Sequence, residues 1–236
     1  ASFFVLAPLT SQISNFVAFG EKWFFPLEDW QKFLACFLFL FYDNGSLVFD
    51  QHFWTLARGN GKNGFISVIS AYFLSPLHNV TQYNGAIVAN SELQAKTSFE
   101  EIFNMIELNP DLKYSKTQNP QGAFKNSRSQ ILGVDTMSKL EYLTSNANTK
   151  DSFRHGFLIF DEVHQYENND IINVLRSGLG KVQPDRTFYI STNGYIRDGV
   201  YDQMLRQARD ILETGDIESR LFPFLCMLDD KEEAED

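Results

Sequence analysis

The chain is poor in cysteine and in positive charge. Its two cysteines cannot supply the several bridges of a disulfide-stapled fold. Cys36 and Cys226 lie inside apolar runs, which predicts buried free thiols in a reducing compartment. The 20 Lys and Arg residues stand against 30 Asp and Glu, a net charge of −10. This excludes an isolated domain that grips nucleic acid through a broad basic face. Any DNA contact must come from a few local basic residues or from several subunits together.

Long apolar segments and repeats are also missing. The most apolar run, residues 33–42, is too short to cross a bilayer and predicts a buried helix. The apolar N-terminal segment lacks a basic lead and is a poor secretion signal. No repeat of 20–50 residues is present. Hydrophobic residues make up 44% of the 236 residues, enough for one large α/β domain or two small ones.

Residues 53–74 have the layout of a phosphate-binding loop. A short apolar run with Phe53 and Trp54 predicts a strand, and apolar residues between Phe65 and Phe73 recur at helical spacing. The loop between them reads Arg58, Gly59, Asn60, Gly61, Lys62, Asn63 and Gly64. Glycines let backbone N–H groups close around phosphate oxygens, the helix N-terminus adds partial positive charge, and a lysine reaches the outer phosphates. We interpret it as a Walker A loop.

This loop departs from the usual Walker A pattern at two positions. Leu56 stands where the pattern has its first Gly, and Asn63 stands where it has Ser or Thr. The alternative is a glycine-rich turn that precedes a core helix.

A second motif lies about a hundred residues downstream. Four apolar residues, Phe157 to Phe160, run directly into Asp161 and Glu162. This predicts a buried parallel strand whose C-terminal end presents charge. In a Walker B motif the first carboxylate holds magnesium, and the second points elsewhere and acts as general base on a water. Apolar runs that end in Asp-Glu are common at strand ends. Because Gly61-Lys62 lies upstream in the right order, however, we interpret this run as a Walker B motif.

The remaining elements complete an alternating pattern of helices and strands. The expected helices are 26–42, 65–74, 91–106, 170–177 and 198–213, with a weakly helical stretch before Leu143. The expected strands are 53–56, 86–89, 131–134, 157–160 and 187–190. Residues 111–128 predict a polar hairpin with its tip at 119–122. Its four cations, Lys113, Lys116, Lys125 and Arg128, indicate a solvated surface or, alternatively, a small DNA-facing patch.

Two further segments carry open alternatives. Gln31 is either an exposed polar residue of a helix or an amide that pairs with an adenine edge. Residues Ser191, Thr192, Asn193 and Gly194 follow the strand at 187–190. They are either an ordinary polar turn or a sensor of the γ-phosphate.

Taken together, these segments resemble the ATPase half of the large terminase subunit of tailed bacteriophages, the motor that packages DNA. The resembling segments are residues 26–31, 57–62, 88–95, 158–164 and 191–194, so the resemblance extends from about residue 20 to about residue 229, nearly the whole chain. The resemblance implies an α/β fold of the RecA-like P-loop NTPase type. A mainly parallel central sheet would then carry helices on both faces.

The resemblance also implies roles for single residues. Gln31 is the adenine-side glutamine, Lys62 contacts the phosphates, and Arg58 stabilises charge on the transferred phosphoryl group. Asp161 holds Mg²⁺ and Glu162 activates the attacking water. Residues 191–194 match the motif that couples hydrolysis to movement. Asn63 replaces the usual magnesium-binding hydroxyl, although an amide oxygen can also ligate magnesium.

These roles predict an ATP-hydrolysing motor domain in residues 1–228. It would move double-stranded DNA into a viral procapsid in the host cell cytoplasm. The implied partners are the portal protein, the small terminase subunit and other copies of the chain in a ring, although the isolated chain could be monomeric. Residues 229–236 are expected to be an acidic tail that begins a linker to a nuclease domain. The alternatives are one lobe of a DExH-type helicase or a nucleotide-binding assembly module that hydrolyses poorly.

Overall fold

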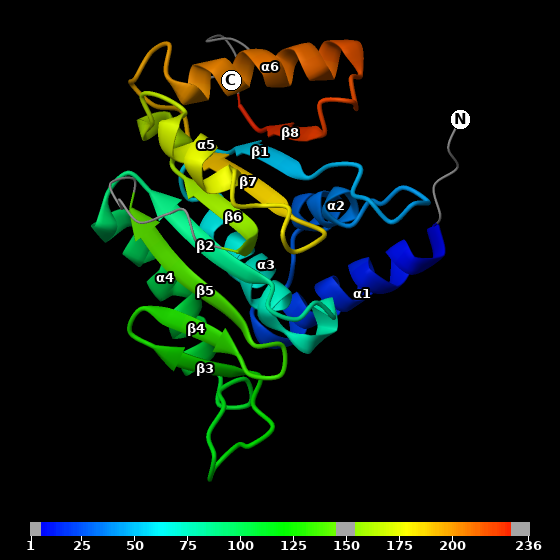
Figure 1. Cartoon of the computed structure of the whole chain (residues 1–236), viewed down its shortest axis with the longest axis vertical. Helices are drawn as coiled ribbons and strands as arrows, with labels where there is room; N and C mark the ends of the chain where they lie inside the picture. Colours follow the sequence, from blue (N-terminus) through cyan, green and yellow to red (C-terminus); the bar gives the residue numbers. More distant parts are fainter. Residues whose placement is uncertain (1–5, 145–153, 228–236) are drawn as a thin grey trace.

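One eight-stranded sheet organises the structure, a computed structural model that describes residues 6–144 and 154–227. Its strands are β1 (Gln51–Thr55), β2 (Asn84–Ala89), β3 (Phe124–Ser127), β4 (Gln130–Gly133), β5 (Ser138–Thr144), β6 (His155–Asp161), β7 (Arg186–Ser191) and β8 (Leu221–Leu225). Their order across the sheet is β3-β4-β5-β2-β6-β7-β1-β8 (Figure 1). The six strands from β5 to β8 in this order run parallel. Only β3 and β4 add antiparallel pairs.

Helices cover both faces of the parallel part. They are α1 (Leu6–Trp23), α2 (Asp29–Leu38), α3 (Lys62–Leu74), α4 (Glu92–Glu107), α5 (Asp170–Arg176) and α6 (Val200–Thr214), with short 3₁₀ turns η1 (Pro76–His78) and η2 (Val163–Gln165). Consecutive residues of β1 show the two layers. Trp54 stacks on Phe65 of α3 at 5.6 Å, whereas Phe53 contacts Tyr201 of α6 at 5.9 Å. The predicted fold class, a mainly parallel sheet between helices, is confirmed.

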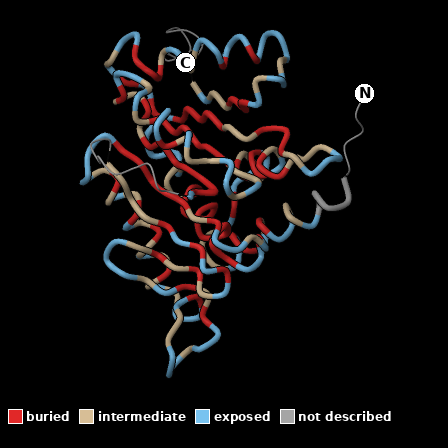
Figure 2. The backbone as a smooth tube through the Cα atoms, viewed as in Figure 1, coloured by how far each residue is buried: buried red, intermediate tan, exposed pale blue. Residues whose placement is uncertain are grey.

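The central strands are apolar because they are buried on both faces. Every residue of β6 and β7 is buried, and Figure 2 shows the buried segments running through the middle of the sheet. In such a sheet the C-terminal ends of all parallel strands lie at one edge. The chain segments that follow β1, β6 and β7 therefore meet there.

One helix was not predicted, and two expectations about helices are wrong. The first 25 residues contain α1, which the sequence patterns do not predict; its Phe16 and Phe19 pack on Tyr72 of α3. The helix expected over 26–42 is α2, and it ends at Leu38. The stretch expected to be weakly helical before Leu143 contains β5, which pairs with β2 and β4.

Other corrections concern the edges of the fold. Residues 119–122 form the predicted turn, in which the Gly122 amide donates to the Asn119 carbonyl at 3.2 Å. It is not the hairpin tip, because the hairpin of β3 and β4 turns at residues 128–129. Strand β8 is absent from the expected set. Both cysteines are exposed and not buried: Cys36 lies on the solvent side of α2, and Cys226 follows the end of β8. The acidic tail expected at 229–236 lies outside the described residues.

Candidate nucleotide-binding site

The loop between β1 and α3 has the backbone of an anion-binding turn. Gly59 and Gly61 adopt φ angles of 82° and 73°, a region that residues with a side chain rarely enter. A Cβ at either position would meet no atom within 4 Å, so the backbone conformation, and not crowding, requires glycine there. Gly61 is the N-cap of α3 and accepts the first helical hydrogen bond, from the Phe65 amide. The amides of the first helical turn are left to bind an anion.

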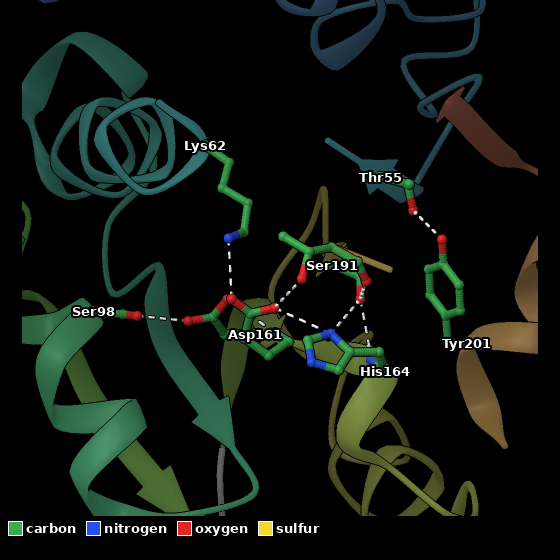
Figure 3. Close-up of polar contacts among 9 residues, drawn as sticks. Thr55, Lys62, Ser98, Asp161, His164, Ser191 and Tyr201 are labelled. Atoms are coloured by element: carbon green, nitrogen blue, oxygen red, sulfur yellow. Dashed lines mark hydrogen bonds and ion pairs between the residues drawn. The ribbon is translucent and has the colours of Figure 1, made fainter. Parts of the chain in front are cut away.

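The two predicted motifs meet at the same edge of the sheet. The Nζ of Lys62 lies 3.0 Å from Oε1 of Glu162. Both side chains are largely buried, with 11% and 19% of their surface exposed. In Figure 3 the lysine reaches down from α3 toward the carboxylates at the end of β6. The cationic loop and the anionic end of β6 therefore come together in space.

Asp161 is held from two sides at the end of β6. The Ser98 hydroxyl of α4 donates to its Oδ2 at 2.6 Å, and the Glu162 amide donates to its Oδ1 at 2.9 Å. Burial raises the pKa of the Asp161 carboxyl, and the Ser98 hydrogen bond offsets only part of this effect. The carboxylate is thus oriented by hydrogen bonds rather than by an ion pair.

Glu162 is the most constrained side chain of the site. Its φ of 51° lies in the left-handed region, which is unusual for a residue with a side chain. Its Oε2 lies 3.2 Å from Nδ1 of His164 and accepts from the Thr192 hydroxyl at 3.3 Å. Burial alone would raise the pKa of Glu162, but the hydrogen bond from His164 and the charge of Lys62 lower it to about 2. Glu162 is therefore ionised at neutral pH.

Besides the direct contact of Thr192, the end of β7 reaches Glu162 through His164. Ser191 Oγ accepts from the His164 amide at 3.1 Å and lies 3.1 Å from its Nδ1. Gly194 lies against the same imidazole, because a Cβ at this position would come within 2.5 Å of ring atoms. His164 is thus enclosed between Glu162 and the end of β7 (Figure 3).

The remaining residues of the site make fewer polar contacts than Lys62 and Glu162. Arg58 is exposed and makes no hydrogen bond or ion pair with the described residues. The Asn63 carbonyl accepts from the Ser67 hydroxyl at 2.9 Å, and Gly64 packs closely against the ring of Phe25. Asn60 and Asn193 both line a mostly apolar pocket of about 380 Å³. Its other lining residues are Thr55, Leu56, Ala57, Cys226 and Met227.

Gln31 differs from the default expectation of an exposed helix residue. It is 3% exposed and is the third residue of α2. Its Oε1 accepts from the Glu28 amide at 2.9 Å, which completes a capping box. The side-chain oxygen therefore makes one structural bond, which leaves its second lone pair and the NH₂ group to contact another molecule.

The oxygen donors at this edge suit magnesium bound together with phosphates. The described residues contain no cluster of three or more His, Cys, Asp or Glu that could hold a metal ion alone. Magnesium at nucleotide sites usually takes only one or two carboxylates, and its other ligands are phosphates and water. Asp161, a buried carboxylate at the end of β6, fits this role, and the amide oxygen of Asn63 is a second candidate ligand.

Sequence reasoning missed two polar residues of the site. Ser98 comes from the middle of α4, and no sequence signal distinguishes it from a surface serine. His164 belongs to the resembling segment 158–164, but neither the resemblance nor the residue pattern assigned it a role. Both contact carboxylates of the motif directly.

Comparison with known proteins points to one family. The family described as "Terminase large subunit, ATPase domain" matches residues 29–210. The terminase large subunits of Lactococcus phages p2 and SK1 are each 26% identical over 192 residues, which is 80% of this chain. The chain spans 34% of the length of these relatives.

Solved structures support the fold. The large terminase of bacteriophage HK97 has a TM-score of 0.73 at 21% identity, covering 91% of this chain and 44% of that one. A large terminase from a thermophilic bacteriophage has a TM-score of 0.53 at 10% identity, covering 79% of this chain and 44% of that one. Among the described residues, no helix is long and apolar enough to cross a membrane.

Proposed function

The chain belongs to the family of terminase large subunit ATPase domains, and we propose that it hydrolyses ATP to move double-stranded DNA into a viral procapsid. One observation carries the proposal: Lys62 and Glu162 lie 3.0 Å apart, beside the buried Asp161, at the C-terminal edge of a parallel sheet. Ligands bind at this edge in open α/β folds. The contact joins the two halves of a phosphate-transfer site.

We assign the binding step to the loop between β1 and α3. The amides of residues 59–64 and the N-terminus of α3 would surround the phosphates. Lys62 would leave Glu162 and contact the outer phosphates. Arg58, which is exposed, is positioned to contact a phosphate of its own nucleotide or that of a neighbouring copy. The apolar pocket beside Asn60 is large enough to take part of the nucleoside.

We assign the chemical step to the end of β6. Glu162 would accept a proton from the attacking water or orient it, once Lys62 has turned to the phosphates. Asp161 and the Asn63 amide would hold magnesium. When bound, the ion would neutralise the charge of the phosphates. Residues 191–194 would transmit the change at Glu162, because Thr192 contacts the carboxylate directly.

Gln31 is more constrained in this proposal than a free adenine-pairing amide would be, because the capping box fixes its orientation. An adenine edge offers a donor and an acceptor, and a free amide matches both. Here the Gln31 oxygen accepts from the Glu28 amide. An adenine donor would therefore share this oxygen with the Glu28 amide through its second lone pair, while the NH₂ group donates to adenine.

The proposal is tested by phosphate release from ATP with magnesium, at several protein concentrations. We expect weak turnover by the monomer, because neighbouring subunits complete the site in a ring. Glu162→Ala should abolish hydrolysis while the circular dichroism spectrum stays native. Hydrolysis close to wild type in this variant would contradict the assignment. Strong turnover that is independent of concentration would contradict the need for a ring.

One residue, Asn63, supports a second candidate function, that of a nucleotide-binding assembly module. Asn63 lacks the hydroxyl that usually ligates magnesium at this position, which favours a module that binds nucleotide without hydrolysing it. Nucleotide binding measured with and without magnesium separates the two. Binding that ignores magnesium, with no phosphate release, would favour the assembly module. Duplex unwinding by the chain alone would instead favour a helicase lobe.

The proposed partners are the portal protein, the small terminase subunit and further copies of the chain. These partners are inferred only from the family to which the chain belongs.

A further inference from the structure

One segment of this acidic protein is basic. Residues 111–139 contain five Lys and Arg against two Asp, a net charge of +3, whereas the whole chain carries −10. The segment comprises the loop before β3, the hairpin of β3 and β4, and the first residues of β5. Figure 1 shows that these strands form the end of the sheet opposite α6.

The three strands expose two lysines on one face. Phe124, Ile131 and Leu140 point into the core toward α4. The alternate residues point the other way, and the register sets Lys125 opposite Leu132 and Leu132 opposite Lys139. The two lysines therefore lie in one row across three strands, about 10 Å apart. No described helix covers this face of β3, β4 and β5 in Figure 1.

These cations are available to bind a partner. Lys125 and Lys139 are exposed, and their ammonium groups make no hydrogen bond or ion pair with the described residues. The same holds for Arg128 in the hairpin turn and Lys116 in the preceding loop. Lys113 is different, because it pairs with Glu107 of α4.

We propose that this basic face, formed by Lys125 and Lys139, contacts the phosphate backbone of double-stranded DNA. The inference rests on the proposed function and adds the surface that meets the DNA. Lysine is a flexible point charge that binds phosphates without reading sequence, as a protein that moves along any sequence requires. Strand β5 lies four strand positions, or about 20 Å, from β1. DNA there would leave the nucleotide loop open.

The test is the salt dependence of binding to a short mixed-sequence duplex, measured by fluorescence anisotropy at about 50 to 200 mM salt. The variant is Lys125→Gln with Lys139→Gln. The matched control is Arg206→Gln with Arg209→Gln, which removes the same charge from the exposed side of α6. Each lost phosphate contact should reduce the slope of log K against log salt by about 0.9. At 0.1 M salt this corresponds to about eightfold weaker binding per contact.

We expect the lysine variant to lose both slope and affinity while the arginine control keeps them. Equal losses in the two variants would mean that only net charge matters and would overturn the inference. So would unchanged binding by the lysine variant, or no DNA binding by the wild-type chain at the lowest salt. Lysine-dependent binding to phosphatidylserine vesicles without DNA binding would assign the surface to membranes and refute it.

ATP hydrolysis without DNA is measured in the same samples. Hydrolysis should be unchanged in both variants, since neither touches the nucleotide site. Absence of hydrolysis from the wild-type chain would count against the proposed function, whereas loss of DNA binding alone concerns only this surface.

Discussion

Replacing Glu162 with Gln should tighten nucleotide binding while it stops hydrolysis. The ammonium of Lys62 lies 3.0 Å from the Glu162 carboxylate. Phosphates must therefore compete with Glu162 for the lysine. Glutamine keeps the size and polarity of the side chain but removes its charge, so Lys62 becomes available to the ligand.

The size of the effect follows from the burial of the ion pair. Exposed pairs contribute about 0.2–1 kcal/mol, and breaking a fully buried pair costs about 3–5 kcal/mol. Lys62 and Glu162 retain 11% and 19% exposure, so we place their pair between these limits, at about 1–2 kcal/mol. If this energy opposes binding, its loss lowers the Kd by about 5- to 30-fold.

The assay is titration of ATP with magnesium by isothermal calorimetry at pH 7. Glu162 is ionised at this pH, because its pKa is about 2. Lys62→Gln serves as the control, since it frees Glu162 but removes the phosphate partner, and it should bind more weakly than wild type. Equal or weaker binding by Glu162→Gln would refute the competition between carboxylate and phosphate.

Two further variants and one pH series test the rest of the site. Asp161→Asn should raise the unfolding midpoint, because burial raises the pKa of this carboxyl and so disfavours its charged form; calorimetry with and without magnesium should also show loss of metal-dependent nucleotide binding. Gly194→Ala should reduce hydrolysis more than nucleotide affinity, because the new methyl group would come within 2.5 Å of the His164 ring; a proportional loss of both would contradict this. The Glu162 pKa is lowered from its ordinary value of 4.5, so the stability that its charge contributes is present above pH 4.5 and lost as pH falls toward 2. The difference in unfolding free energy between wild type and Glu162→Gln should accordingly shrink over that range in denaturant titrations.

The central part of the fold could be predicted from the sequence because its local patterns and its packing agree. Strands β6 and β7 are apolar runs that end in polar residues, and α3 has helical spacing between a glycine loop and a proline. Strand β5 could not be predicted in this way. Its alternation of Leu140 and Tyr142 with polar residues is short, and its pairing with β2 on one side and β4 on the other stabilises a pattern that is weak by itself.

Only those site residues that belong to a sequence motif could be predicted. Lys62, Asp161 and Glu162 belong to motifs, whereas Ser98 reaches Asp161 from 63 residues away in the sequence. Such a contact depends on how α4 packs against the sheet, and local sequence patterns do not predict this packing. The capping role of Gln31 did leave a signal, because Glu28 and Gln31 have the spacing of an N-cap residue and its N3 partner.

The backbone of Glu162 offers a test that is independent of its chemistry. At a φ of 51° a Cβ costs about 1–2 kcal/mol relative to glycine. At ordinary positions glycine is the less stable choice, by about 0.5–1 kcal/mol relative to alanine. Glu162→Gly and Glu162→Ala both remove the carboxylate and its contacts with Lys62 and His164, so they differ only in this backbone term.

The strain therefore predicts an inverted order of stability. The Gly variant should match or exceed the Ala variant in unfolding free energy, by up to about 1 kcal/mol, in paired denaturant titrations. Neither should hydrolyse ATP. If the Ala variant is the more stable by the usual margin, the left-handed conformation of Glu162 is not enforced by its surroundings. The rigid placement of the carboxylate beside Lys62 would then lose its structural basis.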